Sequence, residues 1–162
     1  MGEAKRRLPV GVENFEQIIK DNFYYVDKTG LISELLLSGG MVNLFTRPRR
    51  FGKTLNMSML EHFFSLEGDH SIFDGLGITK DTKLCEEYMG RYPVIFVSLK
   101  GINAATYDNA FNFAVQIMQR TAEEFQFLSD SECLSEHDKS VYRELLESNM
   151  SETVFCGGLK IL

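Results

Sequence analysis

The segment that most constrains the fold of this chain is an apolar run that leads into Gly-Lys-Thr. Residues 41–46 read Met-Val-Asn-Leu-Phe-Thr, which predicts a buried strand, and Gly52-Lys53-Thr54 follows five residues later. The residues after Thr54 form a helical pattern that is apolar on nearly every side, and such a helix belongs inside a protein. The sequence therefore predicts a loop held between a core strand and a core helix.

A strand, a loop with Gly-Lys-Thr and a helix are typical of a site that binds nucleotide phosphates. Backbone N–H groups of such a loop curl around the phosphates, and the helix N-terminus faces the anion. Lys53 would reach the β- and γ-phosphates of ATP, and the Thr54 hydroxyl would ligate Mg²⁺. The predicted nucleotide-binding residues are Arg47, Pro48, Arg49, Arg50, Phe51, Gly52, Lys53 and Thr54, with Thr54 as the metal ligand.

The loop departs from the usual phosphate-loop pattern, which would place its first glycine at position 47, where this chain has Arg47. A basic surface turn that opens an ordinary helix is the alternative. However, Arg47, Arg49, Arg50 and Lys53 concentrate positive charge in a chain of net charge −6. Cations at a helix N-terminus oppose the helix dipole, so this cluster favours a bound anion.

Composition narrows the class of protein. A chain of 162 residues, 44% hydrophobic and 25% charged, is long enough for one globular domain. The net charge of −6 argues against a general nucleic-acid coat protein. No apolar run approaches the roughly 20 residues of a membrane helix, and the charged N-terminus is no secretory signal. We therefore expect a cytoplasmic protein without a membrane partner.

Cysteine and histidine residues show no spacing of a metal or catalytic site. Cys85, Cys133 and Cys156 are far apart and odd in number, which favours reduced thiols over a disulfide framework or a zinc site. His62, His70 and His137 show neither ligand nor triad spacing, so no chemistry is assigned to them.

Hydrophobic periodicity predicts an α/β fold. After a flexible lead over residues 1–12, strands are expected at 41–46 and 94–99, the latter a continuous apolar run typical of a parallel sheet. Flanking helices are expected at 13–20, 28–37, 55–64, 80–89, 107–128, 139–147 and from 151 onward. Alternating strands and helices indicate a parallel sheet covered by helices.

The run Arg-Pro-Arg-Arg-Phe-Gly-Lys-Thr at 47–54, preceded by Tyr-Val-Asp-Lys-Thr at 25–29, closely resembles the predicted AAA-ATPase-like family of bacteria. The resemblance implies that residues 13–162 are the N-terminal part of a P-loop NTPase domain with ATP and Mg²⁺ as cofactors. It also implies a C-terminal domain similar to PD-(D/E)XK nucleases, through which the whole protein would contact nucleic acid. Tyr25, Asp27 and Lys28 belong to the shared pattern, and either they fix the helix at Lys28 or they lie near the nucleotide base or ribose.

Hydrolysis by a P-loop protein needs a second strand that ends in an acid. The 94–99 strand ends in Leu99-Lys100-Gly101, and the family's acidic strand is expected shortly after Leu162, so the sheet is expected to be incomplete and the chain truncated. Residues 1–162 are therefore expected to bind ATP without hydrolysing it alone, which leaves their enzyme status open. Two alternatives are an interaction module that binds nucleic acid or an acidic partner through Arg47, Arg49 and Arg50, and a truncated product without function. The sequence does not indicate the oligomeric state.

Overall fold

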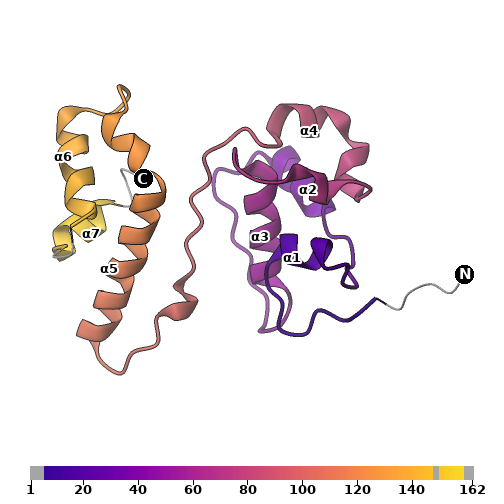
Figure 1. Cartoon of the computed structure of the whole chain (residues 1–162), viewed down its shortest axis with the longest axis horizontal. Coiled ribbons are helices and arrows are strands. Elements are labelled where there is room, and N and C mark those ends of the chain that lie inside the picture. Colours follow the sequence, from indigo (N-terminus) through magenta and orange to yellow (C-terminus); the bar gives the residue numbers. More distant parts are fainter. Residues whose placement is uncertain (1–5, 148–149, 159–162) are drawn as a thin grey trace, which may run out of the picture. The chain divides into compact units, whose positions relative to one another are not determined.

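Helices make up the regular structure of the chain in a computed structural model that describes residues 6–147 and 150–158. Contacts divide the chain into an N-terminal unit, Met1–Val94, and a C-terminal unit, Ile95–Leu162 (Figure 1). The flexible lead predicted for 1–12 lies in part outside the described residues. Among the helices that are described, none has the length and apolar character that crossing a membrane requires.

The N-terminal unit is built from short helices whose positions follow the predicted ones. Their bounds are α1 (Phe15–Lys20), α2 (Gly30–Ser38), α3 (Lys53–Phe64), the 3-10 helices η1 (His70–Phe73) and η2 (Gly77–Lys80), and α4 (Thr82–Tyr88). Side chains cap two of the α-helices: Asn14 accepts a hydrogen bond from the Gln17 N–H at α1, and Asp81 accepts one from the Leu84 N–H at α4. The 3-10 helix η1 is capped by Asp69, whose carboxylate accepts from the Ser71 N–H. The predicted helices at 13–20, 28–37, 55–64 and 80–89 are thus present with small shifts of their ends.

One apolar core joins the elements of this unit. Aromatic rings form its centre, with the Phe73 ring centroid 5.1 Å from that of Phe15 and 5.5 Å from that of Phe63. The buried members of the core come from α1, α2, α3, η1 and η2: Phe15, Ile32, Met59, Phe63, Ile72, Phe73 and Ile78. The helix predicted to be apolar on nearly every side is buried on one face only, since α3 contributes Met59 and Phe63 to the core while Met57 is exposed.

The predicted parallel sheet was wrong. In the part of the chain that the structure describes, residues 41–42 form a bend, residues 43–46 and 94–98 have no regular secondary structure, and a 3-10 helix begins at Leu99. The single β-pairing found there is an isolated parallel bridge between Ser65 and Tyr92. Val42 and Leu44 are 88% and 85% exposed, respectively. A strand is stable only when a neighbouring strand pairs its backbone groups, and no ladder hydrogen bond pairs either segment among the described residues. The expected α/β architecture is therefore wrong, and the regular structure of the described chain is helical.

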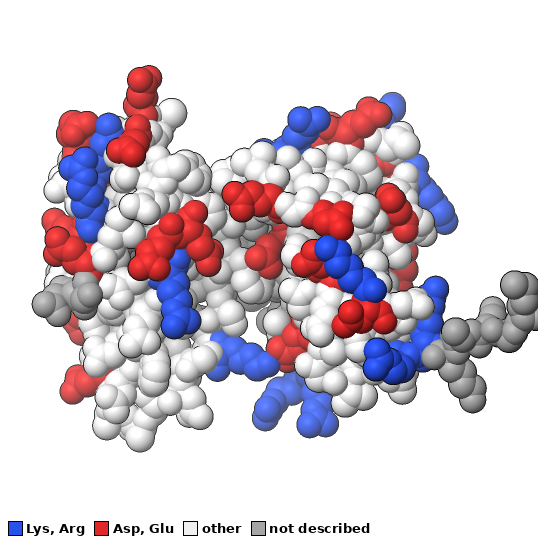
Figure 2. Space-filling model, in the orientation of Figure 1, with Lys and Arg blue, Asp and Glu red and all other residues white. Residues whose placement is uncertain are grey.

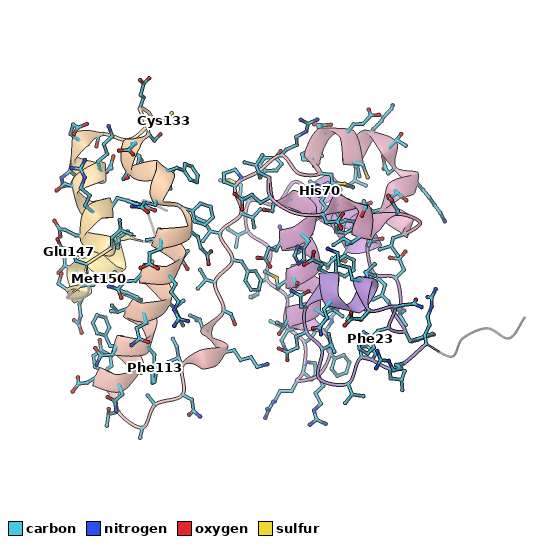
Figure 3. The ribbon with its side chains drawn as sticks, viewed as in Figure 1. Phe23, His70, Phe113, Cys133, Glu147 and Met150 are labelled. Atoms are coloured by element: carbon cyan, nitrogen blue, oxygen red, sulfur yellow. The ribbon has the colours of Figure 1, made fainter. Side chains whose placement is uncertain are left out.

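The Ser65–Tyr92 bridge closes the N-terminal unit at the end of α3. The Leu66 N–H donates to the Tyr92 carbonyl and the Tyr92 N–H to the Phe64 carbonyl, each at 2.9 Å. Beside this bridge the His70 ring, labelled in Figure 3, hydrogen-bonds through Nε2 with the Ser65 carbonyl at 3.0 Å. The same ring lies against Gly90, where a Cβ would come within 2.7 Å of His70 Cε1. His70 therefore has a packing role, which the sequence did not indicate.

The C-terminal unit is a small helical cluster. It contains η3 (Leu99–Gly101), α5 (Tyr107–Glu124), η4 (Gln126–Asp130), α6 (Glu136–Leu145) and α7 (Glu152–Gly158). The buried members of its apolar core are Val115, Met118, Ala122, Tyr142, Leu145 and Met150, the last labelled in Figure 3. The Tyr142 hydroxyl donates to the Ala122 carbonyl at 2.6 Å, which joins α6 to the end of α5.

Two helices in this unit have boundaries that differ from the predicted ones. The helix predicted over 107–128 ends at Glu124, where Phe125 is the cap and a 3-10 turn follows. The helix predicted at 139–147 begins earlier, at Glu136, because the Ser135 hydroxyl caps it by accepting a hydrogen bond from the Asp138 N–H. The last predicted helix is described to Gly158, and residues 159–162 lie outside the described part.

Gly90→Ala is expected to destabilise the N-terminal unit more than Gly75→Ala. Both glycines have positive φ, 67° and 79°, so alanine costs about 1 kcal/mol of backbone strain at either position. Only at Gly90 would the new methyl group collide with the His70 ring, and moving that ring breaks its bond to Ser65; no atom lies within 4 Å at Gly75. Urea unfolding of both variants checks this, and equal losses of stability would contradict the packing role of His70.

Candidate functional site

The predicted phosphate loop lies at the surface of the N-terminal unit, where the chain enters α3 (Figure 1). Residues 41–51 are all exposed. Arg50 and Gly52 have left-handed backbone conformations, with φ of 68° and 71°. Glycine adopts this conformation freely, whereas an arginine there costs about 1–2 kcal/mol. The chain thus makes a sharp, locally strained turn immediately before Lys53.

Lys53 closes this loop upon itself. Its ammonium donates hydrogen bonds to the Arg47 carbonyl and, at 3.0 Å, to the Pro48 carbonyl. The side chain therefore reaches from the first residue of α3 back across the loop. The ammonium is held above the loop by two neutral acceptors rather than by a carboxylate.

The N-terminus of α3 has no side-chain cap. Gly52 occupies the cap position, and the Asn56 N–H donates to its carbonyl at 2.9 Å, as in any regular first turn. The first N–H groups of a helix have no intrahelical acceptor and need a side chain, water or a ligand. Since Gly52 offers no side-chain oxygen, the first turn of α3 presents free donors and the positive end of the dipole to the loop.

The loop before this helix end contains three arginines, Arg47, Arg49 and Arg50, and all three are exposed. Arg47 donates to the carbonyl of its neighbour Thr46 at 3.3 Å, and neither Arg49 nor Arg50 has an ion pair with another described residue. Figure 2 shows Lys and Arg side chains gathered at the lower end of the N-terminal unit, where Figure 1 places the entry into α3. The loop therefore combines positive charge with unsatisfied donors.

Thr54 is exposed in the first turn of α3, so its hydroxyl is accessible to a ligand. Among the described residues, no group of three or more His, Cys, Asp or Glu side chains is arranged to hold a metal ion. The residues of the loop fit a phosphate anion. For Mg²⁺ the described part of the chain supplies the Thr54 hydroxyl and no cluster of carboxylates.

Asp27 and Thr29 join the start of α2 to η2. The Asp27 carboxylate accepts hydrogen bonds from the Thr29 N–H (2.8 Å) and hydroxyl (2.7 Å) through one oxygen and from the Gly77 N–H (2.6 Å) through the other. The Thr29 hydroxyl oxygen, which is buried, accepts from the Ile78 N–H at 3.0 Å. Partial burial by itself would raise the pKa of Asp27, but the bonds from Thr29 and Gly77 outweigh it and lower that pKa below its ordinary value.

Tyr25 connects the same segment to α3. Its hydroxyl donates to the Met59 sulfur at 3.5 Å and accepts a hydrogen bond from the Lys28 N–H at 3.2 Å. Its ring packs edge-on against Phe15, with centroids 5.4 Å apart. Burial raises the pKa of the Tyr25 hydroxyl, which therefore stays protonated. Of the two roles left open for Tyr25 and Asp27, these contacts support fixing the start of α2.

Lys28 differs from its neighbours because its side chain makes no such contact. Its ammonium lies 3.8 Å from the position that a Cβ would take on Gly52, so it stands beside the loop. The structure thus brings the 25–29 segment to the Gly52–Lys53 turn, although the two are distant in the sequence. Sequence reasoning missed Thr29 and Gly77; the Asp-x-Thr spacing at 27–29, a common turn pattern, was the signal available for Thr29.

The described cysteine and histidine side chains form neither a disulfide nor a group that could hold a metal ion. The half-buried Cys85 thiol donates to the Ile78 carbonyl at 3.4 Å, while Cys133 (Figure 3) and Cys156 are exposed. On α3, the buried Nε2 of His62 has no hydrogen-bond partner among the described residues.

Comparison with known proteins identifies relatives of the chain. A family model described as "Predicted AAA-ATPase" matches residues 9–155. A protein of Azotobacter chroococcum mcd 1, described as an uncharacterized protein in the vnfD 5' region, is 35% identical over 99 residues, which cover 60% of this chain and 18% of that protein. The chain therefore spans less than a fifth of the length of this relative. No solved structure matches the chain.

Asp27→Ala is expected to destabilise the chain by about 1–3 kcal/mol, because it leaves the Gly77 and Thr29 N–H groups without their acceptor. Since folding lowers the pKa of Asp27, its contribution is present above about pH 4 and is lost as the pH falls through the lowered pKa. Unfolding free energies of wild type and variant should therefore converge in acid. The control is Asp74→Ala, because the Asp74 carboxylate is exposed and has no bond to another described residue. Equal losses of unfolding free energy in the two variants would contradict the role of Asp27.

Replacing Arg49 and Arg50 together by Gln is expected to leave the melting temperature unchanged or to raise it. Both cations stand at the positive end of α3, where a charge of the same sign costs about 0.3–1 kcal/mol at low salt. A melting curve at low ionic strength is the measurement. A large fall in melting temperature would mean that the two arginines stabilise the fold through ion pairs.

Proposed function

The chain belongs to the predicted AAA-ATPase family, and on that premise we propose that its loop at 47–54 binds the phosphates of ATP. The observation that carries the proposal is the position of Lys53. Its ammonium reaches back over a sharp loop whose helix end lacks a side-chain cap. A phosphate at this end of α3 would accept hydrogen bonds from the free first-turn N–H groups and from Lys53, and would neutralise the adjacent positive charges.

Each residue of the loop has a role in this proposal. Gly52 and the neighbouring backbone would form the cradle, and Lys53 would exchange its carbonyl acceptors for phosphate oxygens. Arg47, Arg49 and Arg50 are exposed and would add charge-assisted contacts, while Pro48 and Phe51 shape the loop. The Thr54 hydroxyl would hold the Mg²⁺ that accompanies ATP. When bound, Mg²⁺ supplies charge neutralisation for the phosphates.

A second candidate is an anionic macromolecule bound by the same arginines. The specific observation in its favour is that Arg49 and Arg50 are exposed without ion pairs to other described residues. Lys53 separates the two functions. Nucleotide phosphates at the helix end require its ammonium, whereas a nucleic-acid backbone spread over the arginines would lose only one contact and part of its salt dependence.

Lys53→Ala is expected to weaken ATP binding by at least about tenfold, because a charge-assisted hydrogen bond contributes about 1.5–3 kcal/mol. Isothermal titration calorimetry with ATP and Mg²⁺, on wild type and variant, measures the two dissociation constants. Lys83→Ala, which removes an exposed lysine from α4, is the control and should bind as wild type does. Equal affinities of wild type and Lys53→Ala would reject the nucleotide site.

A further inference from the structure

The fold holds Lys28 in a defined position, but the charge of its ammonium takes no part in holding it there. Its side chain is exposed and has no ion pair with another described residue. The nearest carboxylate in sequence, Asp27, directs its oxygens to Thr29 and Gly77 instead. Yet the Lys28 ammonium lies beside Gly52, 3.8 Å from the position of a Cβ there. This loop already carries Lys53 and the free donors of α3, so a further cation is electrostatically unfavourable unless an anion is bound.

Both sides of Lys28 are anchored, so its placement is a property of the folded unit. On one side, the Lys28 N–H donates to the Tyr25 hydroxyl, which is itself held by Met59 of α3. On the other, Thr29 is bonded to Asp27 and to the Ile78 N–H. Met59 and Lys53 belong to one helix, so the contact through Tyr25 ties the backbone at position 28 to the element that carries the loop.

We infer that Lys28 is a second phosphate-binding lysine, which contacts the phosphate oxygens of a nucleoside polyphosphate from its position beside Gly52. The inference rests on the proposed nucleotide function and names a residue that the Gly-Lys-Thr pattern does not contain. Lys53 would act from the helix and Lys28 from the 25–29 segment. Lys28 stands next to Gly52, which immediately precedes Lys53, the lysine proposed to bind the phosphates. Lys28 would therefore contact the polyphosphate of the nucleotide and not its base or ribose.

The structural role of the 25–29 segment belongs to Tyr25, Asp27 and Thr29. This role is separate from the ligand-binding role inferred for Lys28. Their side chains make the bonds that hold the segment, whereas only the backbone of Lys28 takes part. Replacing the Lys28 side chain should therefore leave the fold intact. A charge effect on ligand binding without an effect on stability is the signature of the inference.

The experiment compares Lys28→Met, Lys28→Arg, Lys53→Ala and the control Lys83→Met by calorimetry, with ATP, AMP and adenosine as ligands in excess Mg²⁺. Lys28→Met is expected to weaken ATP binding about tenfold or more and adenosine binding less than twofold, with AMP between them. Lys28→Arg keeps the charge and should restore ATP affinity to within a few-fold of wild type. Raising the salt concentration should narrow the gap between Lys28→Met and wild type, because exposed charges are screened.

The outcomes separate this inference from the proposed function. ATP binding that is absent in wild type, or unaffected by Lys53→Ala, overturns the nucleotide site and the role of Lys28 with it. If Lys53→Ala strongly weakens ATP binding while Lys28→Met binds ATP with the affinity of wild type, only the role of Lys28 is overturned. Melting curves without ligand complete the test. If Lys28→Met lowers the melting temperature as much as Asp27→Ala does, Lys28 is a structural residue and the inference is overturned.

Discussion

The position of the candidate loop depends on the burial of one face of α3. Met59 and Phe63 project from that face into a core whose centre is formed by Phe15 and Phe73. Burying such a side chain contributes about 1.5–3 kcal/mol, and close packing of rings fixes the rotation of the helix as well as its place. The Ser58 hydroxyl, one position earlier, accepts a hydrogen bond from the Phe15 N–H at 3.2 Å and so docks α1 on the same helix. With the axis of α3 fixed, its N-terminus and the loop before it are fixed too.

Most helices of this chain could be predicted from the sequence, because their apolar residues recur at helical spacing and their ends carry caps. The long pattern of α5 and the apolar stretch after Thr54 are the clearest cases. The sheet could not be predicted correctly for a physical reason. An apolar, β-branched run such as 94–99 shows that a segment is suited to a strand, but strands are stabilised by partners. The residue types of a segment indicate whether it could form a strand, but they do not indicate which other segment would pair with it.

In the candidate site, too, some features could be predicted from the sequence and others could not. Gly52, Lys53 and Thr54 are contiguous, so a local motif is enough to bring them together, and the structure places them at the start of α3 as predicted. The contacts of Asp27 with Gly77 and the approach of Lys28 to Gly52 join residues that are distant in sequence. Such contacts arise only when the core assembles, and no periodicity or spacing encodes them. For Tyr25, Asp27 and Lys28 the sequence could therefore raise two roles without choosing between them.

The helix caps show where local structural preferences are left unsatisfied. Among the α-helices whose N-caps the structure describes, side chains cap α1, α4, α5 and α6, namely Asn14, Asp81, Thr106 and Ser135. The two helices without a side-chain cap are α2 and α3. These are the helices that begin beside Lys28 and at Lys53. At α2, the Thr29 hydroxyl would be a suitable cap, but it is bonded to Asp27 and Ile78 instead.

The loop before α3 also contains the left-handed Arg50 and a cluster of cations that have no ion pair with another described residue. Elsewhere in the described chain, some exposed charges are paired, such as Lys20 with Glu16 and Asp69, while others, such as Lys83, have no ion pair with a described residue. A sequence that caps α1, α4, α5 and α6 with side chains and leaves the helix end at this strained loop open is expected to use that loop for binding. Free helix donors, backbone strain and unbalanced positive charge would each be relieved by one ligand, a phosphate anion, and this convergence is the strongest physical support for the nucleotide site.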